Sequence, residues 1–243
     1  MKKEITIKLL NLIGFAAALY VNYLSVVTQL GGKSIRELSD KYSNLFTPSN
    51  QTFAIWSLIY ALVFIFLIAQ FFSHYSKGGF TRSYLFFISC ILNGAWIVAW
   101  QLEYIGLSLL IMFALLTVLA LINQQADTEK GVLQKLVFGV YLGWICIATI
   151  ANVTTWLVSL RLSIPASVQV FSTLGILIIA AIIVAWIMKK LANPFLALAV
   201  VWAFYGVYVK RIGDVPEIAY TALAMGALVV LSIFLFSIRP TTR

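Results

Sequence analysis

The chain has 243 residues, of which 62% are hydrophobic and 10% charged, with a formal net charge of +9. Soluble domains carry about 25% charged residues and about 45–50% apolar ones, so the composition excludes an ordinary soluble protein. The positive charge does not indicate a nucleic-acid partner, because Lys and Arg collect in short gaps between long apolar runs. There they fix topology and meet anionic headgroups, so membrane lipids are the expected surroundings.

The apolar runs predict membrane spans, because about 20 apolar residues cross the hydrocarbon core. Backbone groups must be satisfied internally in lipid, so each run predicts a helix. The fold class is therefore all-α: a polytopic transmembrane helical bundle of about eight spans. In chain order the expected spans are Leu9–Leu30, Phe53–Phe72, Tyr84–Gln101, Tyr104–Ile122, Leu136–Leu160, Val168–Met188, Leu191–Val209 and Ile218–Ile238.

The first and the seventh predicted spans each begin with an unusual feature. The first run is longer than the 7–15 apolar residues of a signal peptide, so it predicts an uncleaved helix. The seventh contains Asn193-Pro194 near its start, and proline is tolerated in the first turn of a helix.

The distribution of basic residues predicts orientation. The N-terminal side of an eight-span bundle carries Lys2, Lys3, Lys8, Lys77, Arg82, Lys130, Lys135, Lys189, Lys190, Arg239 and Arg243. The opposite side carries fewer, namely Lys33, Arg36, Lys41, Arg161, Lys210 and Arg211. The positive-inside rule then places both termini in the cytoplasm, and the pattern suits a bacterial inner membrane.

Groups for acid–base or metal chemistry are sparse. The inner parts of the spans contain no Asp, Glu, Lys, Arg or His, and such residues mark proton relays and ion sites in membranes. His74 is expected in a loop and Glu103 at the interface, while Cys90 and Cys146 form no pair with metal-ligand spacing. We therefore expect no catalytic residue, no metal and no cofactor, and the protein is not expected to be an enzyme.

Aromatic and carboxamide side chains inside the spans are the remaining signal. Asn93, Trp96 and Trp100 share one face of a helix by their spacing. Tyr141 and Trp144 form a second stripe with Asn152. Such residues can tie helices together, or they can line an apolar pocket with a few polar anchors. Either reading is open at this point.

At these residues the sequence resembles the TspO/translocator protein family, also called tryptophan-rich sensory proteins or peripheral benzodiazepine receptor-type proteins. Three segments carry the resemblance: Thr47-Pro48 with Phe53 and Trp56-Ser57-Leu58-Ile59-Tyr60, then Leu92-Asn93-Gly94-Ala95-Trp96, and then Tyr141-Leu142-Gly143-Trp144 through Asn152. The 22-residue stretch Gly31–Thr52 is similar to the family's first loop, which acts as a lid. Asn50 stands where the family often has Trp, and the fifth span lacks the arrangement associated with sterol recognition.

The resemblance implies a five-helix module, often dimeric, that binds a planar hydrophobic ligand such as a porphyrin beneath the first loop. It implies a pocket lined by Trp56, Tyr60, Asn93, Trp96, Tyr141, Trp144 and Asn152. Residues 1–162 are expected to form the five-helix module and residues 163–243 three additional helices.

We therefore expect a membrane protein that binds or senses a hydrophobic, tetrapyrrole-like molecule. The alternative is a transporter or permease subunit for an uncharged or amphipathic compound. An enzyme acting on a lipid or tetrapyrrole, including light-dependent porphyrin breakdown, and an assembly protein without a pocket are further rivals.

Overall fold

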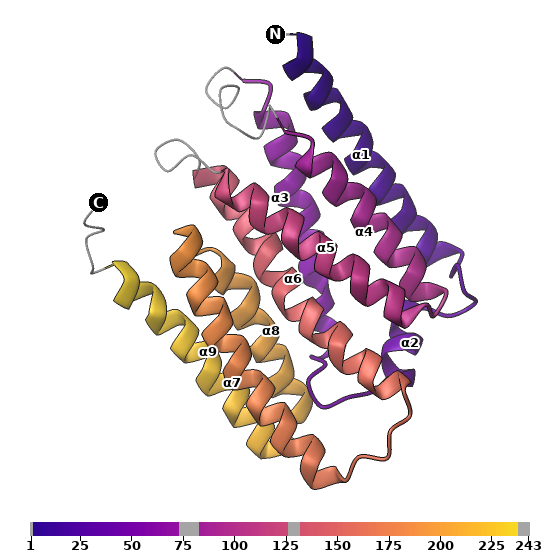
Figure 1. Cartoon of the computed structure of the whole chain (residues 1–243), viewed down its shortest axis with the longest axis vertical. Coiled ribbons are helices and arrows are strands. Elements are labelled where there is room, and N and C mark those ends of the chain that lie inside the picture. Colours follow the sequence, from indigo (N-terminus) through magenta and orange to yellow (C-terminus); the bar gives the residue numbers. More distant parts are fainter. Residues whose placement is uncertain (1, 73–82, 126–131, 238–243) are drawn as a thin grey trace.

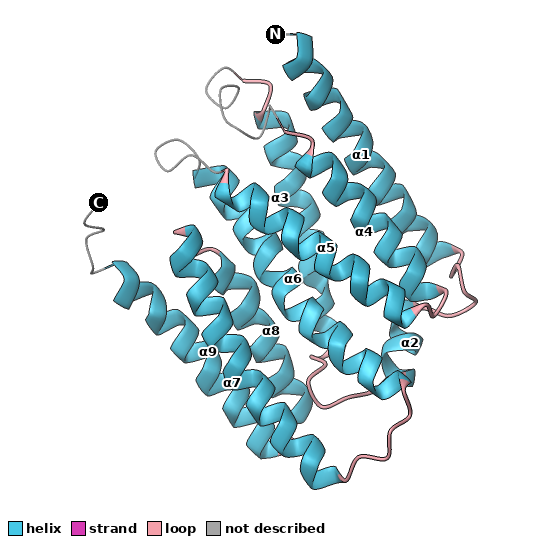
Figure 2. Cartoon of the chain, viewed as in Figure 1, coloured by secondary structure: helices cyan, strands magenta, loops and turns pink. Residues whose placement is uncertain are grey.

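The computed structural model describes residues 2–72, 83–125 and 132–237. These residues form helices joined by loops, and the long helices run side by side in a tilted bundle (Figures 1 and 2). The helical elements in chain order are α1 (Lys2–Val27), α2 (Ile35–Lys41), η1 (Asn50–Ala54), α3 (Ile55–Ala69), α4 (Leu85–Gln101), α5 (Ile105–Gln124), α6 (Val132–Ser159), α7 (Ala166–Leu191), α8 (Leu196–Arg211) and α9 (Pro216–Ser237).

The expectation of an all-α polytopic bundle is confirmed, with one long helix for each of the eight predicted spans. Within the described ranges, six helical stretches are long and apolar enough to cross a membrane. η1 and α3 count together as one of them, Asn50–Ala69, while α4 with 17 residues and α8 with 16 are not among the six. Large apolar side chains cover the outer face, including Leu110, Phe171 and Ile182, and such a surface suits lipid rather than water.

Two helices begin furthest from their predicted starts. α1 begins at Lys2, several residues before its apolar run, because helical hydrogen bonding continues past the lipid boundary. α8 begins at Leu196, so Asn193-Pro194 lies in the turn after α7 and not in a helix. Ala192 takes a left-handed conformation there (φ 47°), which ends α7 before the proline.

α6 is the central helix of the bundle. In its most apolar stretch 72% of the residues are buried, against 28–39% for the other candidate spans. α6 lies against α3, α5 and α8, while α4 packs between α1 and α5, and α9 packs on α7 and α8. One continuous core joins residues of the first five long helices to residues of α7, α8 and α9.

The start of α1 and the end of α9 lie at the same end of the bundle (Figure 1). At the opposite end, the segment between α1 and α3 carries α2 and η1. Of the residues used to predict orientation or chemistry, His74, Lys77, Arg82, Lys130, Arg239 and Arg243 lie outside the described residues.

Candidate functional site

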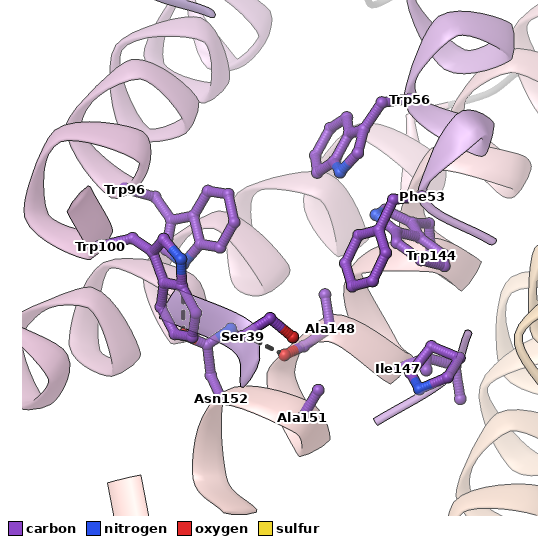
Figure 3. A pocket seen from close by; sticks show the side chains of 11 residues that line it. Ser39, Phe53, Trp56, Trp96, Trp100, Trp144, Ile147, Ala148, Ala151 and Asn152 are labelled. Carbon is purple, nitrogen blue, oxygen red and sulfur yellow. Dashed lines mark hydrogen bonds between the residues drawn. The ribbon is translucent and has the colours of Figure 1, made fainter. Parts of the chain in front are cut away.

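Four tryptophans from three helices meet beneath α2. Trp56 lies in the first turn of α3, Trp96 and Trp100 are one turn apart on α4, and Trp144 comes from the middle of α6. Figure 3 shows their rings around a common space, with Phe53 beside Trp144 and with Ser39 of α2 at the lower edge of that space in this view. The expected spacing on α4 is therefore realised as a shared face.

The rings contact one another in two geometries. Trp96 stacks on Trp100 with ring centroids 5.9 Å apart and on Trp56 with centroids 6.4 Å apart, both nearly parallel. Trp144 meets Trp56 and Phe53 edge-to-face, at 6.3 and 5.8 Å. Both are favourable arrangements for aromatic rings, so the ring contacts stabilise the walls of the pocket.

Asn152 holds one wall in place. Its side-chain oxygen accepts hydrogen bonds from Trp96 Nε1 at 3.3 Å and from Ser108 Oγ at 3.4 Å, and its amide donates to the carbonyl of Ala148 at 2.9 Å. This network joins α4, α5 and α6. It fixes the plane of the Trp96 ring, which lines the pocket.

A second polar chain lies deeper. Asn22 of α1 donates to Tyr60 Oη at 3.2 Å, and the Tyr60 hydroxyl donates to the side-chain oxygen of Asn93 at 3.4 Å. The chain links α1, α3 and α4 through uncharged groups. It supplies polar atoms at the inner end of an otherwise aromatic site.

These side chains enclose two adjoining chambers that share Ser39, Phe53, Trp56 and Trp96. The wider, of about 360 Å³, is lined by Asn22, Ser39, Asn50, Phe53, Trp56, Tyr60, Asn93, Trp96 and Ile97. The narrower, of about 60 Å³, is lined by Ser39, Pro48, Phe53, Trp56, Trp96, Trp100, Trp144, Ile147, Ala148, Ala151 and Asn152. No carboxylate, ammonium, guanidinium or imidazole is among these lining residues.

The structure brings the predicted site residues together, with one in a supporting position. Trp56 and Trp96 line both chambers, Tyr60 and Asn93 line the wider one, and Trp144 and Asn152 line the narrower one. Tyr141 lines neither chamber. It packs edge-to-face behind Trp56 at 5.9 Å, because its place on α6 lies one turn farther from α2 than that of Trp144.

Several lining residues were not predicted as site residues. Phe53 and Trp100 stood in the motifs, and their aromatic character was the available signal. Ser39 lies in the short α2 and Asn50 in η1, apart from the helices that carry the tryptophan motifs, so no periodicity relates them to the pocket. Ala148 and Ala151 contribute by being small, and a small residue in an apolar run gives no distinctive sequence signal.

The segment between α1 and α3 covers the mouth of the pocket. Leu38 of α2 is fully buried against Trp100 and Ile105, and Ser39 beside it lines both chambers. α2 starts with a capping box in which Ser34 and Glu37 bond reciprocally, which stabilises so short a helix. The expected lid is therefore an ordered element over the site.

Glu103, in the turn between α4 and α5, receives three donors from the lid. Lys33 lies 2.5 Å from one carboxylate oxygen, while Lys41 and the Tyr42 hydroxyl bond the other. The hydrogen bonds from Lys33, Lys41 and Tyr42 lower the pKa of Glu103 from 4.5 to about 2. Glu103 therefore stays ionised throughout the physiological pH range.

The arrangement can bind by stacking and hydrogen bonding. Within the described ranges, His, Cys, Asp and Glu form no group of three that could hold a metal ion. The helical bundle and the aromatic pocket define a multi-pass membrane protein with a small-molecule-sized cavity between its helices.

A family model described as TSPO-like protein matches residues 8–235, and the chain belongs to that family. The matched residues run from the first turns of α1 to the end of α9. Comparisons with curated proteins and with solved structures gave no significant match.

Proposed function

We propose that the protein binds or senses a hydrophobic, planar, tetrapyrrole-like molecule in the pocket beneath α2. The observation that carries the proposal is the convergence of Trp56, Trp96, Trp100 and Trp144 on one cavity. Tryptophans of membrane proteins normally lie in belts at the headgroup level. Four indole rings that face an internal space instead suit the flat faces of an aromatic ligand.

The size and the polarity of the cavity support the same proposal. The wider chamber of about 360 Å³ is within the range of small-molecule pockets, about 300–1,000 Å³. Asn22, Asn93 and Asn152 place a few uncharged polar groups around the aromatic walls. A ligand that is flat and apolar with a polar edge matches this lining.

The orientation of the protein is part of the proposal. The two ends of the described chain lie at one end of the bundle, and the lid lies at the other. With both termini in the cytoplasm of a bacterial inner membrane, the pocket faces the outer side. A homodimer, as in other members of the family, is compatible with the apolar outer surface.

The test is a titration of the purified protein with protoporphyrin, followed by tryptophan fluorescence. We expect saturable quenching, and we expect Trp144→Leu to weaken binding by about 1–3 kcal/mol through loss of an aromatic contact and its burial. Trp96→Phe should weaken binding in the same direction.

Trp186→Phe is the matched control, because Trp186 is 58% exposed on α7 and far from the lining residues. It should leave the affinity unchanged. Quenching that does not saturate in folded protein, or equal affinity in the Trp144 and Trp186 variants, would contradict the proposal.

A further inference from the structure

We propose that the ligand of this pocket carries an oxygen acceptor, a carbonyl or carboxylate oxygen, and no positive charge. This inference rests on the proposed function and specifies the chemistry of the bound molecule. It follows from which hydrogen-bonding groups of the pocket are already used and which are left over.

The groups left over are donors. Trp100 and Trp144 line the narrower chamber and are only 7% and 2% exposed, and neither Nε1 has a hydrogen-bond partner among the described residues. Trp96 differs, because Asn152 accepts from its Nε1. Two tryptophans of one cavity wall thus carry buried N–H groups that lack an acceptor.

Two of the acceptors nearby are occupied. The side-chain oxygen of Asn152 already accepts from Trp96 and Ser108, and that of Asn93 accepts from Tyr60. A ligand that offers only donors would leave both indole N–H groups unsatisfied. Burying a donor without a partner is costly, so an acceptor on the ligand is favoured.

A cationic ligand is the main competitor, because indole faces attract cations. The lining residues, however, include no carboxylate to compensate a desolvated positive charge. This lack of a compensating charge selects against a cation.

The experiment compares fluorene with fluorenone, two flat molecules of the same shape that differ in one carbonyl oxygen. Binding to the full chain in detergent is measured by equilibrium dialysis, with partitioning into empty micelles subtracted. We expect fluorenone to bind about 5- to 20-fold more tightly than fluorene, on the scale of satisfying a buried donor. A methylacridinium cation of similar size should bind more weakly than either.

The ratio of the two affinities is the readout in the variants, because loss of ring contact affects both probes alike. Trp100→Phe or Trp144→Phe should reduce the ratio, and Trp186→Phe should preserve it. Equal affinities for fluorene and fluorenone in the unmodified protein, or preferential binding of the cation, would overturn the inference and leave the pocket in place. If neither small probe binds, the inference is also overturned, while the protoporphyrin titration decides the proposed function separately.

A second inference rests on different contacts, those that hold the lid. We infer that residues 33–42 open at Glu103 to admit the ligand, and that they turn about the following segment, which α8 holds fixed. This too rests on the proposed function, as it describes access to the same pocket.

The Glu103 side of the lid is a latch of exposed charges. Lys33 and Lys41 are each 43% exposed in their side chains, and Glu103 is 26% exposed. Ion pairs exposed in this way contribute little to stability, and salt screens them. Leu38 adds a buried apolar contact with Trp100 and Ile105.

The α8 side of the lid is a buried anchor. Arg211, 9% exposed in its side chain, donates to the carbonyls of Asn44 and Leu45 at 2.6 and 3.1 Å and pairs with Asp214 at 2.7 Å. Leaving a buried guanidinium without these partners is strongly destabilising.

Two more contacts extend this anchor along α8. Trp202 Nε1 donates to the carbonyl of Thr52 at 2.9 Å, and the Ser49 amide donates to the carbonyl of Gly206 at 3.0 Å. A Cβ on Gly206 would lie 2.0 Å from Thr52 Oγ1, so the close approach requires glycine. The anchor thus consists of buried or backbone hydrogen bonds, whereas the latch consists mainly of exposed charges, so opening occurs at Glu103.

The experiment measures protoporphyrin association and dissociation rates by stopped flow. Glu103→Gln should raise both rates by the same factor, about 2- to 10-fold from the loss of two exposed pairs, with little change in affinity. Higher salt should raise both rates in the unmodified protein and have less effect on the variant. Glu217→Gln, an exposed carboxylate at the start of α9, is the matched control and should change neither rate.

Arg211→Gln should instead weaken affinity, because the anchored segment carries the lining residues Pro48, Asn50 and Phe53. If protoporphyrin binds and Glu103→Gln leaves both rates unchanged at all salt concentrations, the lid is not the route of access. A change in affinity, with the two rates changing by clearly different factors, would likewise overturn the inference. Absence of binding in the unmodified protein would instead remove the proposed function.

Discussion

At the scale of single residues, the side chain of Asn152 connects three helices by hydrogen bonds, which its position in an apolar helix does not indicate. It accepts from Trp96 and Ser108 and donates to Ala148, so one carboxamide organises groups from three helices. Asn93 and Asn22 serve similarly through Tyr60. Uncharged side chains can do this in lipid because each finds its partners inside the bundle.

We expect Asn152→Ala to weaken protoporphyrin binding by about 1–3 kcal/mol, because Trp96 Nε1 loses its acceptor and the ring loses its fixed plane. The affinity is measured by fluorescence titration. Ser108→Ala is the control, since Ser108 also bonds the carbonyl of Ile105 and its loss leaves the bond from Trp96 to Asn152 intact. An Asn152 effect no larger than that of Ser108 would show that Trp96 needs no such support.

The lowered pKa of Glu103 predicts how the rate of ligand dissociation depends on pH. Its pKa is lowered in the folded protein from 4.5 to about 2, chiefly by the hydrogen bonds from Lys33 and Lys41. A lowered carboxyl pKa stabilises the folded state fully above pH 4.5, and this contribution is lost as the pH falls toward 2. We expect ligand dissociation to be unaffected by the latch from pH 8 to 5 and to accelerate below 4.5.

The measurement is the dissociation rate across this range, with Glu103→Gln as reference. The variant should lack the acceleration that protonation of Glu103 causes in the unmodified protein. An acceleration centred near neutral pH in the unmodified protein would assign the effect to a different group.

At the scale of elements, the crossing of α6 and α8 depends on two glycines of α6. A Cβ at Gly143 would lie 2.3 Å from the carbonyl oxygen of Leu196, and one at Gly139 would lie 2.8 Å from the side chain of Asn193. Small residues at such crossings let helix backbones approach closely in membranes. Asn193 uses this proximity to bond Asn123 at 2.7 Å and the carbonyl of Lys135 at 2.9 Å.

We expect Gly143→Ala to destabilise the protein by about 1–3 kcal/mol, since neither backbone can move without displacing a helix. The thermal midpoint in detergent is the measure. Gly175→Ala on α7 meets nothing within 4 Å and should leave the midpoint unchanged or slightly higher. Equal midpoints in the two variants would show that the crossing tolerates a wider separation.

At the scale of the whole molecule, the lid connects the two parts of the chain. The pocket belongs to α3, α4 and α6, yet the segment that closes it is held by α8 through Arg211 and Trp202. The core is also continuous from α6 to α8. The division into residues 1–162 and 163–243 stays a prediction.

Expression of residues 1–162 alone tests whether they form a module that folds and binds ligand independently of residues 163–243. We expect the fragment to reach the membrane but to lose saturable protoporphyrin binding, because the anchor of the lid and the packing on α6 are removed. Binding assays on the purified fragment and the full chain provide the comparison. Full affinity in the fragment would establish an independent five-helix module and would contradict the anchor assigned to α8.

Part of the fold follows from the sequence by itself. The apolar runs determine the long helices, because in lipid each segment must satisfy its own backbone hydrogen bonds. The spacing of Asn93, Trp96 and Trp100 likewise places them on one face, since helical periodicity is local. The aromatic residues of α3, α4 and α6 are therefore predictable as members of a common site.

Only the tertiary structure decides how these helices are arranged and what covers them. Tyr141 lies behind Trp56 and not in the pocket, because its place depends on the rotation of α6 against α3. Arg211 meets Asn44 and Leu45 more than 160 residues away in the chain, and no periodicity encodes such a pairing. Local hydrogen bonding determines the helices, whereas the lid and its anchor arise from packing between segments distant in sequence.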